Sequence, residues 1–354
     1  MSVFDPMSLA EPIVQAPMAG GPSTVQLALA VCEAGGLGFL AAGYRAADAV
    51  EEDIRALRSG TARSFGVNLF VPSAAPADPD RLRPYLAELA PEAERQGVSL
   101  GAPHFDDDAW ERKLELVCRE RVPVVSFTFG LPGRAAIEQV HAAGAAVWVT
   151  VTHSDEAVRA ERAGADALVV QGTEAGGHRG GFIDDEDAAG SGLLALLRVV
   201  ARHVSLPLIA TGGIADGAGV AAVLCAGAAA AQIGTALMLA PEAGTNEAQR
   251  ALLAQPVPTR ITRAFTGRSA RGMVNRFLRE HTDNAPVAYP EIHHVTSGLR
   301  AAARKRGDAD AFNLWAGQAH QLVAEKPAGE IVQEMGATAR QVAAEVARRL
   351  AATD

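Results

Sequence analysis

Short apolar runs alternate with helix-like segments over residues 13–235, and this alternation restricts the possible fold more than any other feature of the chain. Runs of this length between helical segments are typical of buried strands in βα units, which pair in parallel. Eight runs are present, at residues 13–16, 37–41, 65–69, 122–127, 146–151, 167–170, 207–210 and 230–233. Eight consecutive units predict a sheet that closes on itself, so we expect an α/β fold of the TIM (β/α)8 barrel class.

Glycines mark the ends of several predicted helices. Four helical segments end in AGG or AGA directly before an apolar run, with Gly35, Gly144, Gly164 and Gly227 at the turns. Glycine at this position allows the left-handed backbone conformation that commonly ends a helix. The motif supports the division into helices and strands.

An insertion and a change of pattern divide the chain. Residues 73–121 are longer than one crossover needs and include a further apolar stretch at 98–102, which indicates an insertion in the third unit. After residue 235 the alternation stops, and the remaining sequence is typical of helices and loops. We predict a barrel over residues 1–240 and a mainly helical C-terminal cap over residues 241–354.

The charge balance argues against nucleic acid or membrane partners. The chain contains 41 Asp and Glu against 32 Lys and Arg, a formal net charge of -9, which does not favour binding to polyanions. No apolar run reaches the roughly 20 residues that a membrane span needs, and no signal peptide is evident. The cysteines, Cys32, Cys118 and Cys225, are too few for a disulfide framework. We therefore expect a cytoplasmic protein.

Amides, hydroxyls and glycines follow the apolar runs. In a parallel barrel the active site lies at the carboxyl ends of the strands, so these residues are the candidates for it. They occur in QAPMAG (15–20), GVNLF (66–70), SFTFG (126–130), QGTEAGGH (171–178), TGG (211–213) and QIGTA (232–236). Neutral hydrogen-bonding groups suit a flat heteroaromatic ligand better than a metal ion, and we predict no metal site.

Two glycine turns follow the last two strands, TGGI from Thr211 and QIGTA from Gln232. Barrels commonly bind phosphate at this position through backbone N–H groups. The alternative is that both are simply tight βα turns. Asp216, just after TGGI, is expected to cap the following helix.

His178 is the candidate catalytic residue. It lies on a loop directly after a strand, between the glycine pairs 176–177 and 180–181, where an imidazole can reach a bound substrate. The alternative is a structural histidine. His293 and His294 have no carboxylate or cysteine nearby at metal-binding spacing.

The residues that several other enzyme classes require are absent from the expected positions. The only lysines are Lys113, Lys305 and Lys326, and none follows a strand, which argues against a Schiff-base aldolase. No G-x-G-x-x-G motif follows a strand, so a Rossmann dinucleotide site is not supported. The loop after the sixth strand carries no cysteine, unlike IMP dehydrogenase-type barrels.

With these residues in order, the chain resembles the nitronate monooxygenase family, the flavin enzymes formerly called 2-nitropropane dioxygenases. The resemblance covers nearly the whole chain. It includes QAPMAG, GVNLF, VVSFTFG, VVQGTEAGGHRG, ATGGIADG and QIGTA, and then FTGRSARGMVN at 265–275 and LWAGQ at 314–318.

The resemblance implies FMN as the cofactor and assigns the site residues by position. Pro17, Met18 and Ala19 would lie along the isoalloxazine ring, Asn68 and Gln171 would hydrogen-bond the flavin, and Gly176 would pass close to it. The phosphate would be held by Gly213, Gln232, Ile233, Gly234 and Thr235. His178 coincides with the family's active-site histidine. Thr128 stands where many members carry a second histidine.

The resemblance also implies a reaction and its partners. The enzyme would use O2 to oxidise a small anionic substrate, an alkyl nitronate such as propionate 3-nitronate, to a carbonyl compound and nitrite, as a monomer or homodimer. Arg179, Arg268 and Arg271 are candidates for binding a substrate carboxylate. Two alternatives are a reductase of the same barrel family that uses NAD(P)H, acting on enoyl or quinone substrates, and a phosphate-binding barrel without redox function.

Overall fold

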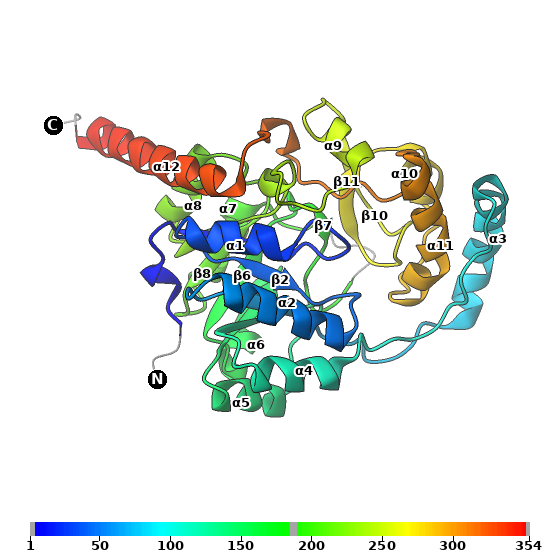
Figure 1. The fold of residues 1–354 in the computed structure, drawn as a ribbon, viewed down its shortest axis with the longest axis horizontal. Helices are drawn as coiled ribbons and strands as arrows, with labels where there is room; N and C mark the ends of the chain where they lie inside the picture. Colours follow the sequence, from blue (N-terminus) through cyan, green and yellow to red (C-terminus); the bar gives the residue numbers. More distant parts are fainter. Residues whose placement is uncertain (1–3, 185–189, 352–354) are drawn as a thin grey trace.

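Eight parallel strands form a barrel at the centre of the molecule, as a computed structural model shows (Figure 1). The structure describes residues 4–184 and 190–351. All eight predicted runs form strands, which are β1 (Ile13–Gln15), β2 (Phe39–Ala41), β3 (Gly66–Phe70), β4 (Val124–Thr128), β5 (Ala146–Val151), β6 (Ala167–Gln171), β8 (Leu208–Thr211) and β9 (Ala230–Ile233). The prediction of a TIM barrel is confirmed.

The sheet closes between its first and second strands. Its order is β1-β9-β8-β6-β5-β4-β3-β2, and every neighbouring pair is parallel. The two outer strands meet through the bridge between Val14 and Leu37. The Gln15 N–H donates to the Leu37 carbonyl at 2.9 Å, and the Leu37 N–H donates to the Ile13 carbonyl at 3.0 Å. Closure therefore pairs both edges of the sheet formed by the described strands.

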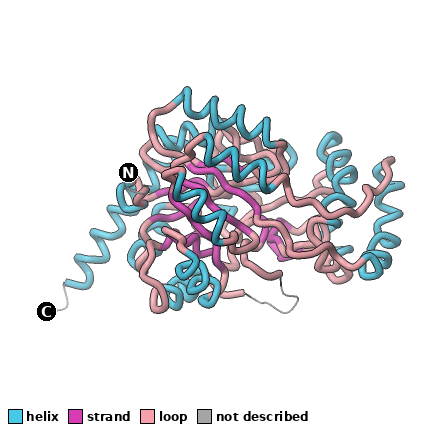
Figure 2. The backbone as a smooth tube through the Cα atoms, turned by 90° about the horizontal axis from the view of Figure 1, so that it is seen from below, coloured by secondary structure: helices cyan, strands magenta, loops and turns pink. Residues whose placement is uncertain are grey.

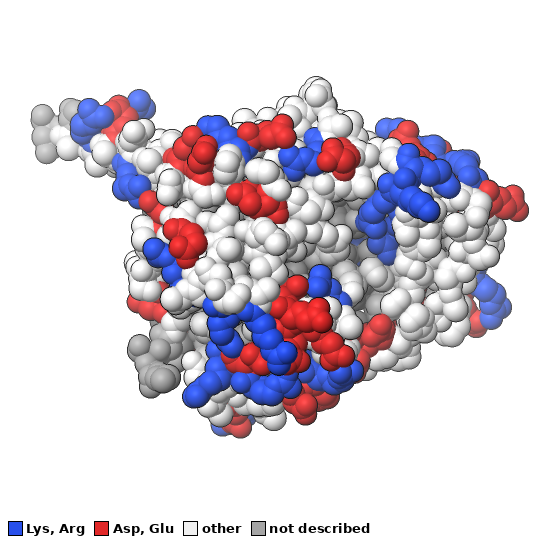
Figure 3. All heavy atoms as spheres, in the orientation of Figure 1, with Lys and Arg blue, Asp and Glu red and all other residues white. Residues whose placement is uncertain are grey.

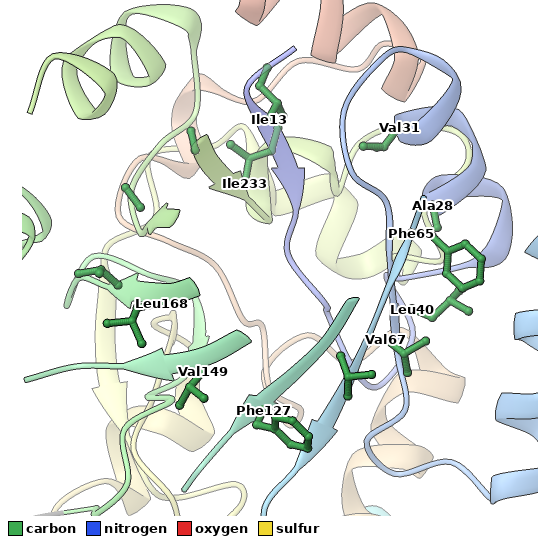
Figure 4. Close-up of a cluster of buried hydrophobic side chains, with 14 of the residues drawn as sticks. Ile13, Ala28, Val31, Leu40, Phe65, Val67, Phe127, Val149, Leu168 and Ile233 are labelled. Atoms are coloured by element: carbon green, nitrogen blue, oxygen red, sulfur yellow. The ribbon is translucent and has the colours of Figure 1, made fainter. Parts of the chain in front are cut away.

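Side chains alternate along each strand between two apolar layers. One set packs between the strands and the surrounding helices (Figure 4), and includes Ile13, Val67, Phe127, Val149, Leu168 and Ile233, with Ala28 and Val31 of the first helix beside them. The alternate positions form a second buried cluster that fills the barrel, with Val14, Val124, Trp148, Val169 and Ile209 among its members. The two layers explain why the strands read as continuous apolar runs.

Helices surround the strands and build a lobe beside the barrel (Figure 2). Among the described residues, no helix is both long enough and apolar enough to span a bilayer. The predicted glycine turns have positive φ, at Gly35, Gly144, Gly164 and Gly227. The helices are α1 (Val25–Glu33), α2 (Ala47–Gly60), α3 (Pro79–Gln96), α4 (Trp110–Arg119), α5 (Arg134–Ala142), α6 (Ser154–Ala163), α7 (Leu193–Val200), α8 (Gly217–Cys225), α9 (Glu247–Leu253), α10 (Arg276–His281), α11 (Glu291–Arg306) and α12 (Ala328–Ala351).

The insertion in the third unit supplies part of the lobe. Helix α3 packs on α11 and away from the barrel wall, and the hydroxyl of Tyr85 donates to the carbonyl of Ala264 at 2.7 Å. Helix α4, which also falls within the predicted insertion at 73–121, instead packs against α2, α5 and β3 as a barrel helix. The inserted part is therefore shorter than the sequence suggested.

A small antiparallel sheet in the lobe differs from the prediction of helices and loops after residue 235. Its strands are β7 (Gly177–His178), β10 (Thr259–Thr262) and β11 (Ala270–Met273), in the order β10-β11-β7. At two to four residues they are too short to show a period in the sequence. The terminal helix α12 packs on α8 and α1 of the barrel, so the division at residue 240 remains a prediction.

Candidate active site

The inward-facing side chains of the barrel change from apolar to polar toward the carboxyl ends of the strands. Val124, Trp148, Val169 and Ile209 lie in the buried interior cluster. Further along the strands, toward their carboxyl ends, the inward-facing side chains are polar and line a cavity of about 590 Å³. These are Asn68, Thr128, Thr150, Gln171, Thr211 and Gln232. A cavity of this size can hold a cofactor and a small substrate.

Most of the predicted site residues lie together in the wall of this cavity. They are Pro17, Met18, Ala19, Asn68, Gln171, Gly176, His178, Gly213, Gln232, Gly234 and Thr235. Ile233 is the exception, since its side chain belongs to the cluster between strands and helices. The alternation of a strand explains this, because Gln232 points into the barrel and its neighbour must point out.

The two glycine turns after β8 and β9 offer backbone donors to the cavity. Gly213 has φ +68, and within the described residues neither its N–H nor that of Gly234 donates to a protein acceptor. The Thr235 hydroxyl accepts from the Gly317 N–H at 3.0 Å. Asp216 caps α8 as predicted, accepting from the Gly219 N–H at 2.8 Å. Free amides beside a helix start suit a phosphate group.

The three amide side chains of the cavity wall differ in how they are held. The nitrogen of Asn68 donates to the hydroxyls of Ser126 and Thr128, at 2.9 and 2.8 Å. In the described part of the chain, the amide of Gln232 has no protein partner. Gln171 is engaged with the loop that follows it, so Asn68 and Gln232 have more hydrogen-bonding capacity left for a ligand.

Gln171 holds the loop that carries His178. Its nitrogen donates to the carbonyl of His178 at 3.0 Å, and its oxygen accepts from the N–H of Gly180 at 2.8 Å. The sequence suggested a contact between Gln171 and the cofactor, whereas these hydrogen bonds give it a positioning function. The direct contact remains a prediction.

The His178 imidazole stands in an aromatic surrounding at the cavity wall. Its ring lies edge-on to Phe129 and Trp315, with centroids 5.6 Å away in both cases. Its Nε2 lies 2.9 Å from the Thr266 hydroxyl. Burial, and then the charge of Arg268, lower the pKa of His178 to about 3. The side chain is therefore neutral at physiological pH.

The three arginines predicted to bind substrate do not line the cavity, and backbone carbonyls bind them instead. Arg179 donates to the carbonyl of Gly172 at 2.8 Å, and Arg271 to that of Thr173 at 2.8 Å. Arg268 donates to the carbonyls of Arg179 and Gly181 and lies over the ring of Phe129. These arginines support the loop that carries His178, on the side away from the cavity.

Sequence reasoning missed the side chains that helix α11 contributes to the cavity. These are His293, Ser297, Arg300 and Arg304. Their spacing of four, three and four residues places them on one helical face, which is a signal that the sequence contained. It went unused because nothing in the sequence shows which face of α11 meets the barrel.

Two groups of histidines and carboxylates come close together in the lobe. His294 lies 3.6 Å from Asp106, a carboxylate 188 positions away that spacing in the sequence could not reveal. Its ring is stacked on His104 at 3.9 Å. In the second group Arg276 binds both Glu92 and Glu280. The absence of a metal site therefore remains a prediction.

Fold and cavity together define an enzyme of the (β/α)8-barrel class, with its site at the carboxyl ends of the strands and a lobe over it (Figure 3 shows the hollow between the two). A profile described as "Nitronate monooxygenase" matches residues 3–337. The nitronate monooxygenase of Pseudomonas aeruginosa is 40% identical over 341 residues, covering 93% of this chain and 96% of that protein. A probable nitronate monooxygenase of Staphylococcus aureus is 36% identical over 337 residues, covering 93% and 94%. The chain belongs to the nitronate monooxygenase family and is an oxidoreductase.

Solved structures share the fold over the whole chain. The nitroalkane oxidase of Streptomyces ansochromogenes has a TM-score of 0.93 and 49% identity, covering 96% of this chain and 98% of that one. FabK from Thermotoga maritima has a TM-score of 0.76 and 28% identity, covering 98% and 97%. The enoyl reductase domain of MlnA from Bacillus amyloliquefaciens, at 11% identity and a TM-score of 0.64, shows likeness of fold alone.

Proposed function

We propose that the protein is an FMN-dependent enzyme that oxidises alkyl nitronates with O2 to a carbonyl compound and nitrite, with propionate 3-nitronate as the expected substrate. Membership of the nitronate monooxygenase family supports the reaction class. The observation that carries the proposal is a neutral His178 in the wall of a cavity whose other groups fit a flavin and its phosphate. A cytoplasmic location and a monomeric or homodimeric state remain predictions.

The cavity supplies groups of the kind that FMN requires. Flat apolar backbone at Pro17 to Ala19 can lie against the ring system, and Asn68 and Gln232 offer amides to its carbonyl and N–H edge. The free N–H groups of Gly213 and Gly234 suit the phosphate. When bound, FMN supplies the redox chemistry, and the chain supplies binding, orientation and electrostatics.

His178 is suited to orient an anion that is already formed. We assign the proton of the neutral ring to Nδ1, with Nε2 accepting from the Thr266 hydroxyl 2.9 Å away, because the oxygens of a nitronate only accept hydrogen bonds and need an N–H donor. A group whose pKa is about 3 is a weak base at neutral pH. Its N–H can donate a hydrogen bond to the anion, but the ring is poorly suited to deprotonate a neutral nitroalkane. This favours a nitronate as the substrate.

Two additions to the purified protein test this proposal. The visible spectrum should show a bound flavin, and anaerobic mixing with propionate 3-nitronate should change that spectrum, while NADH should not. The likeness to FabK makes a NAD(P)H-dependent reductase the alternative to exclude. Reduction by NADH but not by nitronate would overturn the proposal, and a colourless protein that binds no added FMN would favour a barrel without redox function.

A further inference from the structure

Helix α11 presents two arginines to the cavity at a place that the cofactor assignment leaves unused. Arg300 and Arg304 lie one turn apart on the face that also carries His293 and Ser297. Arg300 is 6% exposed. The phosphate is expected beside the β8 and β9 turns, where Gly213 and Gly234 lie. The two arginines therefore need another ligand.

Arg300 is held by its own helix and keeps donors for the cavity. Its Nε donates to the hydroxyl of Thr296 at 3.0 Å, and one terminal nitrogen donates to the carbonyl of His293 at 2.8 Å. A guanidinium has five N–H groups in a fixed fork. In the part of the chain that the structure describes, the second terminal nitrogen has no protein acceptor.

Arg304 is fixed by contacts that leave its charge unpaired. One terminal nitrogen donates to the side-chain oxygen of Asn313 at 2.5 Å, and the guanidinium lies 5.3 Å from the centre of the Phe312 ring. Neither contact is with an anion. Both hold the group in one orientation at the cavity wall, as a preformed binding site requires.

Among the described residues, no carboxylate compensates the two charges. Within residues 4–184 and 190–351, no Asp or Glu oxygen lies within 4 Å of either guanidinium. Tyr44 and Tyr289 are also electrostatic neighbours of Arg300, and both remain neutral because burial raises their pKa values. A buried charge without a counter-ion is costly, and Arg300 is buried while Arg304 is partly buried, so two such groups in one cavity wall are grounds for an anionic ligand.

Arg300 lies close enough to His178 for its charge to lower the pKa of that histidine. His293 is stacked on Tyr44 at 4.1 Å and also accepts from Arg300, and the charge of Arg300 reaches both histidines. Arg268 supplies the other nearby positive charge, but Asp184 lies beside it and its donors bind carbonyls. The phosphate of the cofactor has its own donors in the β8 and β9 turns, which leaves Arg300 and Arg304 for another anion.

We propose that Arg300 and Arg304 form a second anion subsite, which binds a carboxylate carried by the nitronate substrate and makes the enzyme select nitronates with a second negative charge. The inference rests on the proposed function. A carboxylate shared between two guanidinium groups forms charge-assisted hydrogen bonds, which are stronger than neutral ones. Selection arises because an uncharged nitronate leaves the arginines unpaired.

Kinetics with two nitronates of matched shape test the subsite. Propionate 3-nitronate carries the carboxylate, and the nitronate of 3-methyl-1-nitrobutane replaces it with an isopropyl group. We expect the wild-type kcat/KM to favour the first by roughly 10- to 100-fold. R304M should remove most of this preference, mainly through KM, with little change for the uncharged substrate. R306M is the matched control, since Arg306 on the same helix binds the Gln96 carbonyl outside the cavity.

Binding of a stable mimic gives a second readout that does not depend on turnover. Succinate resembles the carboxylate nitronate in length and charge, and butyrate lacks its second carboxylate. Calorimetric titration of the holoenzyme should show tighter binding of succinate than of butyrate, with the difference lost in R304M and partly restored in R304K. R300M extends the test, and R304M decides it if R300M does not fold.

The outcomes separate the subsite from the reaction. Equal kcat/KM for both nitronates in the wild type, or an equal loss for both in R304M, would overturn the subsite while leaving nitronate oxidation intact. If neither nitronate is oxidised but succinate binding depends on Arg304, the reaction proposal fails and the anion subsite stands. A loss of NADH oxidation in R304M would assign the arginines to a dinucleotide and overturn the inference.

Discussion

His178 combines a catalytic position with an unusually weak basicity. It is enclosed by aromatic rings and lies near arginines, which both disfavour its charged form. Its orientation is fixed by Thr266 and, through the backbone, by Gln171. The residue therefore orients the substrate through a hydrogen bond and does not attract it through a net charge.

His178→Ala should keep the flavin and lose most of the turnover. No predicted phosphate or ring contact involves the imidazole, so the ratio of flavin to protein absorbance should match that of the wild type. Loss of a positioned hydrogen-bond donor to the anion should lower kcat by about 100-fold. Oxygen uptake with propionate 3-nitronate measures this, and His203→Ala, at an exposed histidine, is the control. Wild-type turnover in H178A would remove His178 from the mechanism.

Gly176 is required because the backbone of the lobe passes directly over it. A Cβ at this position would lie 2.5 Å from the carbonyl carbon of Ala316 and 2.5 Å from the nitrogen of Gly317. Gly176→Ala should therefore displace the loop or the 316–317 backbone and weaken flavin retention. Gly133→Ala, where a Cβ meets nothing within 4 Å, should behave like the wild type. Flavin content after gel filtration decides the point, and full retention in G176A would show that the cofactor does not depend on this contact.

At the scale of elements, the short strand β7 links the active-site loop to the lobe. Its two residues pair with β11, while Gln171 holds the same loop from the barrel side. The loop is thus attached to both halves of the cavity wall. Such double attachment keeps His178 in place without any long element of its own.

Gln171→Met should loosen this loop. The substitution keeps the length of the side chain but leaves the Gly180 N–H and the His178 carbonyl without their partners, at a cost of about 1–3 kcal/mol for each group that stays buried. Hydrogen exchange should rise in peptides covering residues 171–184, and kcat should fall. Unchanged exchange with loss of flavin would instead support the direct cofactor contact that the sequence suggested for Gln171.

The barrel could be predicted because each of its units is local in the sequence. The runs at β1 to β9, the glycine turns and the polar residues after each strand are all readable within about twenty positions. The lobe could not be predicted in the same way. Its sheet joins His178 to Ala270 and Met273 to Thr259, and strands of this length carry no periodic signal.

The functions of the single arginine side chains could not be predicted from the sequence either. Arg268 and Arg300 are both buried and follow no motif that separates their tasks. Tertiary contacts direct Arg268 to the carbonyls of Arg179 and Gly181, whereas Arg300 is held by its own helix and lines the cavity. A sequence can supply candidates for an anion site, but only the packing of α11 on the barrel selects among them.

For the molecule as a whole, the cavity depends on the lobe as much as on the barrel. The face drawn in Figure 3 carries charged groups of both signs, with the hollow between barrel and lobe, and the buried arginines are confined to the interior. Because α3 is inserted between β3 and β4 and packs on α11, the substrate wall is tied to the barrel at several points of the chain. Lobe and barrel should therefore lose structure together.

Buried neutral histidines should make the molecule sensitive to mild acid. Burial and nearby arginines lower the pKa of His178 to about 3 and that of His293 to about 2, against about 6.5 in an unfolded chain. Between pH 6.5 and these folded values the unfolded chain binds protons that the folded chain does not. The contribution of each neutral histidine to the free energy of unfolding is therefore fully present above pH 6.5. It falls as the pH drops, by up to about 1.4 kcal/mol per pH unit for each histidine.

His293→Asn removes one of these groups and should make the pH dependence shallower. The asparagine oxygen can accept from Arg300 as Nδ1 does, so the fold should persist. Thermal unfolding midpoints from pH 7 to 5, at constant FMN and salt, should fall less for H293N than for the wild type. His203→Asn at the exposed histidine should keep the wild-type slope. Parallel slopes for all three proteins would mean that carboxylates, not the histidines of the cavity, set the acid limit.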